Sequence, residues 1–374
     1  MAKPEKAPIK VGIFTYAFHG GGMEMALLRL GKYLQAQGME VEITVFSEKG
    51  AWFEQIGETG LKGVFLSHKG LETKLQRTFH YLKALKYIFQ KKYDVIFLNH
   101  TRYGQRAVPF LRRFSKTRTV SVLHNTDASI FEIGLMHAAS LDAVVAVGPL
   151  VEELAKQWAP HSRIHQIRNG VDLPQTFGLK EERHGKPFTL VFVGRLEHAQ
   201  KGVFFLPEIL ENCRKRGLDL HLIIAGTGPD EVELKRLFGE KNLLGVVRFA
   251  GSLPTKEVYQ LLLSSHVMLM PSFFEGFSVV LLEALVCGCL PLVTRLENIT
   301  TPVIKDGENG FLIDGNDNID MFAERITYLY THRDQMEKMS HATSLAAAQN
   351  YSVEAMGEKY RDLILSLVGG NRKE

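Results

Sequence analysis

The chain has 374 residues, of which 45% are hydrophobic and 23% charged. That length suits two domains better than one core, and the composition is typical of a globular protein rather than a coiled coil, a collagen or a disordered chain. The net charge is +4, but residues 1–180 hold 24 Lys and Arg against 15 Asp and Glu (+9), and the remainder holds 21 against 26 (−5). The basic first half indicates an anionic partner.

The N-terminal sequence lacks the apolar stretch of a signal peptide. The longest apolar run, 279–293, carries Glu283 and falls short of the ~20 residues of a membrane span. The three cysteines, Cys213, Cys287 and Cys289, show neither CxxC spacing nor histidine partners. We therefore expect a cytoplasmic chain without a disulfide framework or a zinc site.

In the first half, short apolar runs alternate with helical patterns. The run at 9–16 ends at a glycine cluster, 20–22, and a helical pattern follows over 23–37. A second helix is predicted at 75–91, and further strands are predicted at 40–46, 62–66, 94–98, 119–123 and 143–147. This order predicts a parallel sheet with right-handed crossovers.

Residues 173–187 contain two prolines and no apolar period, and they are predicted to be a linker between an N-terminal domain, 1–172, and a C-terminal domain, 188–351. The second domain repeats the alternation. A helix is predicted at 203–216, and strands at 188–193, 220–225, 246–249, 267–270 and 290–293. The predicted fold class is therefore α/β, with two Rossmann-like, doubly wound parallel-sheet domains facing a cleft. Ligands of such sheets bind at strand carboxyl ends.

Two cations follow the first strand of the second domain. Arg195 comes directly after Gly194, and Lys201 comes six residues later. They can neutralise a diphosphate in place of a metal, although solvated surface charges would give the same pattern. No Asp-x-Asp motif occurs in the chain, so we expect no metal site.

Two glutamates accompany a predicted helix start at 277–280. Glu275 precedes the helix and Glu283 lies within it, among leucines. Backbone amides at a helix start bind anions, and carboxylates accept hydrogen bonds from sugar and ribose hydroxyls. Stabilisation by the helix dipole alone is the alternative for Glu275, whereas a carboxylate on an apolar helix needs a partner.

Taken together, these motifs resemble those of the retaining GT-B glycosyltransferases of family 4, also called glycosyl transferases group 1, over nearly the whole chain. The strongest match is the E-x7-E block, 274–288. Supporting matches lie at 20–24, 169–172, 194–202 and 225–229. The resemblance also implies that a terminal helix, about 352–374, packs back on the first domain.

The resemblance implies that Arg195 and Lys201 hold the diphosphate of a nucleotide-sugar donor, that Glu283 binds its ribose, and that Glu275 contacts sugar hydroxyls. Other residues implied at the donor are Gly21, Gly22, Gly194, Gly226, Gly228, Phe277, Ser278 and Val279. His124, at a predicted strand end, would lie against the donor sugar, with a packed cleft histidine as the alternative. The implied reaction retains the anomeric configuration and uses no metal or other cofactor, with UDP favoured over GDP.

Three positions depart from the family pattern. Ser278 stands where many relatives carry glycine, and His266 where an aspartate is usual; we expect both to be tolerated. The loop at 296–302 lacks the usual Gly-Gly pair, so the sequence leaves the identity of the sugar open.

Residues 69–92 form a basic segment with an apolar stripe at helical spacing. The stripe comprises Leu75, Phe79, Leu82, Leu85 and Phe89. It can bury against the sheet or lie on an anionic membrane, and the sequence leaves both open. The candidate acceptor or membrane residues are Lys83, Lys86, Lys91, Lys92, Arg112 and Arg113.

The sequence thus predicts a glycosyltransferase for a lipid-linked or surface-polysaccharide acceptor, of lipopolysaccharide or capsule type, peripheral on the inner face of the cell membrane. No nucleic-acid partner is expected. Another GT-B enzyme, such as a nucleotide-sugar epimerase, and a catalytically silent nucleotide-sugar-binding protein at the membrane are the alternatives. A dehydrogenase is disfavoured because 20–24 lacks the G-x-G-x-x-G spacing.

Overall fold

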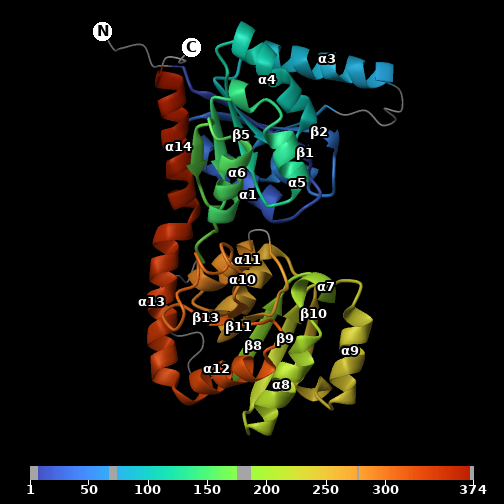
Figure 1. Ribbon diagram of the computed structural model, residues 1–374, viewed down its shortest axis with the longest axis vertical. Coiled ribbons are helices and arrows are strands. Elements are labelled where there is room, and N and C mark those ends of the chain that lie inside the picture. The colour runs from blue at the N-terminus through green and yellow to red at the C-terminus, as the bar shows by residue number, and fades with distance from the viewer. Residues whose placement is uncertain (1–6, 67–73, 175–186, 276–277, 371–374) are drawn as a thin grey trace. The chain divides into compact units, whose positions relative to one another are not determined.

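The computed structural model describes residues 7–66, 74–174, 187–275 and 278–370. The chain divides into two compact units; in Figure 1 the first combines the blue-to-green N-terminal segment with the red helix α14, and the second runs from green to orange-red. Unit 1 joins Met1–Gly170 to Val353–Glu374, and unit 2 is Val171–Ser352. The first division therefore comes shortly before the predicted linker at 173–187, of which residues 175–186 lie outside the described ranges.

Unit 1 contains a parallel sheet of seven strands in the order β3-β2-β1-β4-β5-β6-β7. The strands are β1 (Lys10–Ala17), β2 (Glu40–Glu48), β3 (Lys62–Phe65), β4 (Val95–Asn99), β5 (Arg118–Leu123), β6 (Ala143–Ala146) and β7 (Ile164–Gln166). The helices are α1 (Gly22–Ala36), α2 (Phe53–Glu58), α3 (Lys74–Lys91), α4 (Arg102–Phe114), α5 (Ala128–Gly134), α6 (Pro149–Trp158) and α14 (Val353–Gly369). Strands β4 and β6 are buried at every position, which explains their continuous apolar sequences.

Helix α14, at the C-terminal end of the described chain, packs against the early elements of unit 1. It contacts α1 and β4, and the rings of Tyr360 and Phe97 meet edge to face with centroids 5.4 Å apart. Figure 1 shows this helix in red beside elements that form at the opposite end of the sequence. Unit 1 is therefore built from two segments that are far apart in the chain.

Unit 2 contains a parallel sheet of six strands in the order β10-β9-β8-β11-β12-β13. The strands are β8 (Phe188–Val193), β9 (Leu220–Ala225), β10 (Val247–Gly251), β11 (Val267–Met270), β12 (Leu290–Thr294) and β13 (Phe311–Ile313). The helices are α7 (His198–Lys201), α8 (Phe205–Lys215), α9 (Glu231–Glu240), α10 (Thr255–Ser264), α11 (Val279–Val286), α12 (Ile319–Thr331) and α13 (Arg333–Tyr351).

The core of unit 2 lies on both faces of its sheet. Along β11, Val267 and Leu269 join the cluster under α8, α9 and α12, whereas Met268 and Met270 join the cluster under α10, α11 and α13. This alternation is the two-residue period of a strand that is covered by helices on both sides. The predicted fold class, two Rossmann-like parallel-sheet domains, is confirmed.

The strand order of each sheet reverses at one point. In unit 1 the chain leaves β1 toward β2 on one side and later returns to place β4 on the other; β8 and β11 repeat this in unit 2. Loops that follow the two central strands diverge at such a point and leave room for a ligand. We therefore expect ligand-binding residues at the carboxyl ends of β1, β4, β8 and β11.

One buried carboxylate fixes the edge of the unit 1 sheet. Glu42 on β2 is 6% exposed. It accepts hydrogen bonds from Lys91 Nζ at 2.7 Å, from Lys62 Nζ at 2.9 Å, and from the hydroxyls of Tyr87 and Tyr93. Burial alone would raise the pKa of this carboxyl, but these donors outweigh burial and lower its pKa to about 2.

Replacing Glu42 with glutamine should lower the free energy of unfolding of unit 1 by about 3 kcal/mol at neutral pH, because four donors lose their charged acceptor. The native pKa of about 2 lies below the ordinary value of 4.5, so this contribution is complete above about pH 4.5 and disappears as the pH falls to about 2. Trp52 and Trp158 both belong to unit 1, so urea unfolding followed by tryptophan fluorescence measures the effect.

The matched control is Glu40→Gln on the same strand, where an exposed carboxylate pairs with Lys10 at 3.5 Å. It should change the free energy of unfolding by less than about 0.5 kcal/mol. A difference between native protein and Glu42→Gln that stays constant down to pH 2 would contradict the role of this carboxylate.

Candidate active site

The loops after β8 and β9 approach each other at the predicted glycines. Gly226 has φ +137°, and a Cβ atom there would lie 1.8 Å from the carbonyl oxygen of Gly194; at Gly228 it would lie 2.2 Å from that of Leu196. Only glycine permits this approach. Gly226 and Gly228 thus shape the loop that presents Arg195, and nothing in their surroundings identifies a donor contact.

A second close approach joins α7 to the loop after β11. Gly202 follows Lys201 in the left-handed conformation (φ +63°), and a Cβ atom there would lie 1.9 Å from the carbonyl oxygen of Pro271. The amide of Phe273 donates to the carbonyl of Gln200 at 2.9 Å. These contacts hold the carboxyl-end loops of β8 and β11 side by side.

The side chains at this junction form a compact polar cluster. Lys201 Nζ lies 2.7 and 2.8 Å from the two carboxylate oxygens of Glu275. Ser272 Oγ donates to Glu275 Oε1 at 2.8 Å. The side chain of Glu275 is 4% exposed and that of Lys201 is 18% exposed, so the pair is largely withdrawn from water. Hydrogen bonds between ionised partners in such surroundings are strong and directional.

Arg195 lies apart from this cluster. Its side chain is 64% exposed, and its Nε atom is 3.3 Å from Glu197 Oε2. Among the described residues, Arg195 makes no hydrogen bond or ion pair with Glu275 or Ser272. The two predicted phosphate-binding cations therefore differ: Lys201 is fixed by Glu275, whereas Arg195 has room to change its side-chain conformation.

Helix α11 supplies the remaining donor residues of unit 2. Ser278 is its N-cap, Val279 is its first residue, and Glu283 follows one turn later at 8% exposure. The first-turn amides of α11 and the carboxylate of Glu275 both belong to the chain that follows β11, whereas Lys201 reaches Glu275 from the chain that follows β8. Phe277, also predicted at the donor, lies outside the described residues.

In unit 1 the glycine cluster leads directly into a helix. Gly22 is the first residue of α1, and Gly21 is its N-cap with an extended backbone that any residue can adopt. The conformational demand falls on Gly20, at φ +105°. The amides at the start of α1 still form a potential anion site after β1.

His124 follows β5 and is held by a residue that ends β4. Asn99 Oδ1 lies 2.8 Å from His124 Nε2. Asn99 Nδ2 donates to the carbonyl oxygens of Phe14 and Phe97, at 3.1 and 3.3 Å. Exchanging the amide oxygen and nitrogen would set Oδ1 against two carbonyl oxygens, so the orientation is fixed.

This orientation determines the protonation of His124. Because Oδ1 accepts, Nε2 carries the hydrogen. Burial, with a smaller contribution from the nearby His100, lowers the pKa of His124 to about 4, so the imidazole is neutral near pH 7. Nδ1 is then an acceptor without a hydrogen, and it has no partner among the described residues. Such an acceptor suits a ligand hydroxyl better than a ligand phosphate.

Two residues of these clusters, Asn99 and Ser272, were not predicted. Asn99 directly follows the predicted strand 94–98, just as His124 follows 119–123. Applying the strand-end rule to both parallel neighbours would have paired them. Ser272 had no comparable signal, because its hydrogen bond to Glu275 depends on the turn at Pro271.

The basic surface of unit 1 differs from its prediction. The buried face of α3 carries His80, Ala84 and Ile88. Phe79 and Leu82 are 71% and 54% exposed, so of the two interpretations that the sequence left open, burial against the sheet does not apply to this part of the stripe.

Two of the predicted surface cations are engaged within the fold. Lys91 binds Glu42 at 2.7 Å, and Arg112 lies 4.0 Å from Asp142. Exposed cations and exposed apolar side chains together make up what we call the α3–α4 surface: Lys83, Lys86, Arg113, Phe79, Leu82, Phe110 and Phe114. Lys92 follows α3 with a left-handed backbone.

The described residues, 7–66, 74–174, 187–275 and 278–370, bear on metal binding and on membrane insertion. No group of three or more His, Cys, Asp or Glu residues in these ranges could hold a metal ion. Within the same ranges, no helix is long and apolar enough to cross a bilayer.

The sequence matches two protein families in succession. The family Glycosyltransferase Family 4 matches residues 20–175, and the family Glycosyl transferases group 1 matches residues 177–345. The structure resembles that of HepE of Anabaena in complex with UDP and glucose, with a TM-score of 0.76, 17% identity, and coverage of 96% of this chain and 100% of HepE. The architecture is thus that of the GT-B glycosyltransferases.

Among curated relatives, the phosphatidyl-myo-inositol mannosyltransferase of Mycolicibacterium smegmatis is 24% identical over 89% of this chain and 87% of its own length. WcaL of Salmonella typhimurium, named for colanic acid biosynthesis, is 24% identical over 67% of this chain. The match spans 64% of the length of WcaL. This chain belongs to glycosyltransferase family 4, as the motifs predicted.

Replacing Asn99 with leucine should remove the constraint on His124. In the native protein, nitrogen NMR of ¹⁵N-histidine-labelled material should show His124 as the single Nε2–H tautomer, with a pKa near 4. In Asn99→Leu it should populate both tautomers, because Nε2–H has lost its acceptor. The spectrum of His124→Gln identifies the signals.

Gln105→Leu is the matched control, since Gln105 is also a fully buried amide, donating to Ser121 Oγ and the carbonyl of Gly134 at 2.9 Å. It should leave the His124 signals unchanged. A native His124 that carries its hydrogen on Nδ1, or that titrates near its ordinary pKa of 6.5, would show that Asn99 does not set the tautomer.

Proposed function

We propose that this protein transfers a glycosyl group from a UDP-sugar to a hydroxyl acceptor, with retention of configuration and without a metal ion. The observation that carries the proposal is the Lys201–Glu275–Ser272 cluster, which follows the two central strands of unit 2 and adjoins the chain leading into α11. Family membership supports the reaction class, and the UDP named with HepE supports the nucleotide.

In this proposal, three kinds of group neutralise the negative charge of the donor diphosphate. The ammonium of Lys201 and the amides at the start of α11 bind the diphosphate, and the exposed Arg195 turns toward it on binding. When the glycosyl bond breaks, these preorganised positive groups stabilise the negative charge on the leaving phosphate. Glu283 accepts hydrogen bonds from the ribose hydroxyls.

Glu275 orients the sugar rather than attacking it. Its Oε1 atom already accepts from Ser272 and Lys201, and Oε2 accepts from Lys201 at 2.8 Å. Oε2 keeps a lone pair for one sugar hydroxyl. A carboxylate bridged by an ammonium on both oxygens is a weak nucleophile, which favours front-face attack by the acceptor hydroxyl over a covalent intermediate. In unit 1, the neutral His124 Nδ1 is proposed to accept a hydrogen bond from a ligand hydroxyl.

The acceptor, in this proposal, is lipid-linked or part of a surface polysaccharide. The names of the two relatives refer to phosphatidyl-myo-inositol and to colanic acid biosynthesis. The α3–α4 surface combines exposed aromatic and aliphatic side chains with lysine and arginine, the combination that binds anionic membranes. Peripheral attachment of unit 1 to the cytoplasmic membrane would bring a lipid-linked acceptor to the enzyme.

UDP-glucose should raise the melting temperature by about 3–6 °C in EDTA at ten times its dissociation constant, because binding to the folded state stabilises it. Glu283→Ala and Lys201→Met should reduce this shift to less than about 1 °C. Differential scanning fluorimetry with UDP-, GDP- and ADP-glucose measures it. Glu233→Ala on α9, whose carboxylate is 45% exposed and pairs with Arg236 at 2.6 Å, is the control and should keep the full shift.

A requirement for Mg²⁺ or Mn²⁺ in binding or turnover would overturn the metal-independent reading. A shift with none of the three nucleotide sugars would overturn the enzyme assignment itself. A larger increase in melting temperature with GDP-glucose than with UDP-glucose would show that the donor is a GDP-sugar.

Anionic vesicles should bind the protein through the α3–α4 surface. Flotation with phosphatidylglycerol vesicles at low salt should recover the native protein, and the double variants Lys83→Glu/Lys86→Glu and Phe79→Ser/Phe114→Ser should bind at least about tenfold more weakly. The control Lys32→Glu/Lys256→Glu reverses two exposed charges elsewhere and should bind as the native protein does. Equal flotation of all variants would remove this surface from the proposal.

A further inference from the structure

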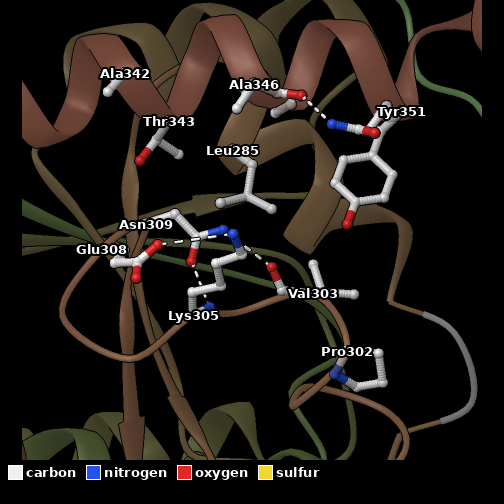
Figure 2. A pocket seen from close by; sticks show the side chains of 12 residues that line it. Leu285, Pro302, Val303, Lys305, Glu308, Asn309, Ala342, Thr343, Ala346 and Tyr351 are labelled. Carbon is white, nitrogen blue, oxygen red and sulfur yellow. Dashed lines mark hydrogen bonds and ion pairs between the residues drawn. The ribbon is translucent and has the colours of Figure 1, made fainter.

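Two turns of unit 2 are closed in the same way, by a side chain that accepts a hydrogen bond from a backbone amide. In the loop between β12 and β13, Asn309 Oδ1 accepts from the amide of Lys305 at 2.7 Å. Figure 2 shows Asn309 on the wall of a cavity of about 430 Å³. At α7, His198 Nδ1 accepts from the amide of Phe204 at 3.2 Å. The turn that His198 closes contains Lys201.

The backbone on both sides of Lys201 is held by His198. The amide of His198 donates to Oδ2 of Asp230, the N-cap of α9, at 2.6 Å. The carbonyl of His198 accepts from the amide of Gly202 at 3.0 Å, and its ring accepts from that of Phe204. Together these three bonds fix the backbone from which the side chain of Lys201 extends.

The ring of His198 also contacts the loop after β11. It stacks on the ring of Phe204, with the centroids 4.3 Å apart and the planes inclined by 15°. It meets the ring of Phe273 edge to face, at 5.4 Å and 89°. Phe273 lies two residues before Glu275 in the sequence. Because such ring contacts are favourable, the imidazole joins the turn that carries Lys201 to the loop that carries Glu275.

The bond to Phe204 requires a neutral imidazole. An amide hydrogen needs an acceptor, so Nδ1 carries no hydrogen and Nε2 carries one. Protonation would place a hydrogen on Nδ1 against the amide hydrogen, and the bond would be lost. Burial lowers the pKa of His198 from its ordinary value of 6.5, and the carboxylate of Asp230 acts in the opposite direction. The rings packed against it, those of Phe204, Phe205 and Phe273, are uncharged.

We propose that His198 is a positioning residue of the donor site. Its neutral imidazole closes the turn that holds Lys201 against Glu275, and so keeps the ammonium where the donor diphosphate binds. His198 acts through Lys201 and does not itself touch the donor. The inference rests on the proposed function, which assigns Lys201 to the diphosphate. Opening of the turn would weaken donor binding, because the strength of a charge-assisted hydrogen bond depends on its geometry.

Donor affinity should therefore depend on pH through His198. UDP-glucose is a suitable ligand because its diphosphate is esterified at both ends and does not titrate near neutral or mildly acidic pH. Its dissociation constant, measured by titration calorimetry, should be lowest above pH 6.5. It should rise about three- to tenfold as the pH falls through the lowered pKa of His198, the factor expected for one lost hydrogen bond. The midpoint should coincide with the titration of His198 in ¹⁵N NMR.

Two substitutions separate the hydrogen bond from the packing of the ring. His198→Phe keeps an aromatic ring but removes the acceptor, so it should bind UDP-glucose about three- to tenfold more weakly at every pH. His198→Asn places a neutral oxygen near the position of Nδ1, as Asn309 does in its own turn. It should bind as the native protein does at neutral pH, without the loss in acid. Native affinity in His198→Phe, or a native profile that follows His198→Asn while His198 titrates, would overturn the proposal.

Two controls test whether the effect is specific to His198. His221 is exposed on β9, so His221→Asn should keep the native pH profile. Asn309→Leu removes the acceptor of the other turn in unit 2, so it should lower the melting temperature and leave donor affinity unchanged. Equal weakening of donor binding by Asn309→Leu and His198→Phe would show a general loosening of unit 2, and the proposal would fail.

The position of Lys201 can also be measured without a donor. Its side chain is 18% exposed and held by both oxygens of Glu275, so acetylation followed by mass spectrometry should modify it slowly. His198→Phe should accelerate this modification about threefold relative to Lys305, whose side chain is 77% exposed. Unchanged acetylation of Lys201 in His198→Phe would refute the role of His198, even if the native protein binds UDP-glucose. Faster acetylation in a protein that binds none of the nucleotide sugars would support that role and refute the proposed transferase function instead.

Discussion

The candidate site of unit 2 depends on a lysine and a glutamate that have both been withdrawn from water. Removing two charges from solvent is costly unless their geometry is good and the remaining lone pairs are satisfied. Here Lys201 contacts both oxygens of Glu275, and Ser272 satisfies a further lone pair. This geometry exists because the backbones at Gly202 and Pro271 nearly touch. A side chain at Gly202 would push the two loops apart and leave an unpaired charge.

In unit 1, a buried polar side chain is also held by a hydrogen bond, but both partners are neutral. Asn99 and His124 end adjacent parallel strands, as the loops bearing Lys201 and Glu275 follow adjacent strands of unit 2. In both units one residue fixes the other and leaves a defined acceptor, Nδ1 in one case and Oε2 in the other. In both sheets, the residues that follow adjacent parallel strands contact each other. In unit 2 they form a charged pair, which suits a site for a diphosphate. In unit 1 they leave an uncharged acceptor, which suits a hydroxyl.

Much of this architecture could be predicted because buried parallel strands have continuous apolar sequences. The strands at 188–193, 220–225 and 267–270 were predicted with the bounds that the structure gives. The amphipathic period of α3 left open whether its apolar stripe is buried. In the structure Tyr87 and Lys91 bind the buried Glu42, and Phe79 faces outward. Periodicity reports which residues share a face, but a polar anchor can decide which face is buried.

The sequence predicted which residues belong to the site better than it predicted which of them contact each other. Lys201 and Glu275 were both identified, but as separate ligands of phosphate and sugar, because 74 residues separate them in sequence. Their contact follows from Gly202, whose left-handed turn and close approach are invisible in a single sequence. Ser272 shares this limitation, whereas Asn99 could have been found from strand order alone.

The discontinuous construction of unit 1 has a consequence for biosynthesis. A ribosome releases the segment up to Gly170 first, then the whole of unit 2, and α14 only afterwards. Unit 2 can complete its core during translation, whereas the surface around Phe97 must wait for Tyr360 to be synthesised. During that interval a nascent chain exposes apolar groups that the finished protein covers, which makes this the stage at which chaperones would be most needed.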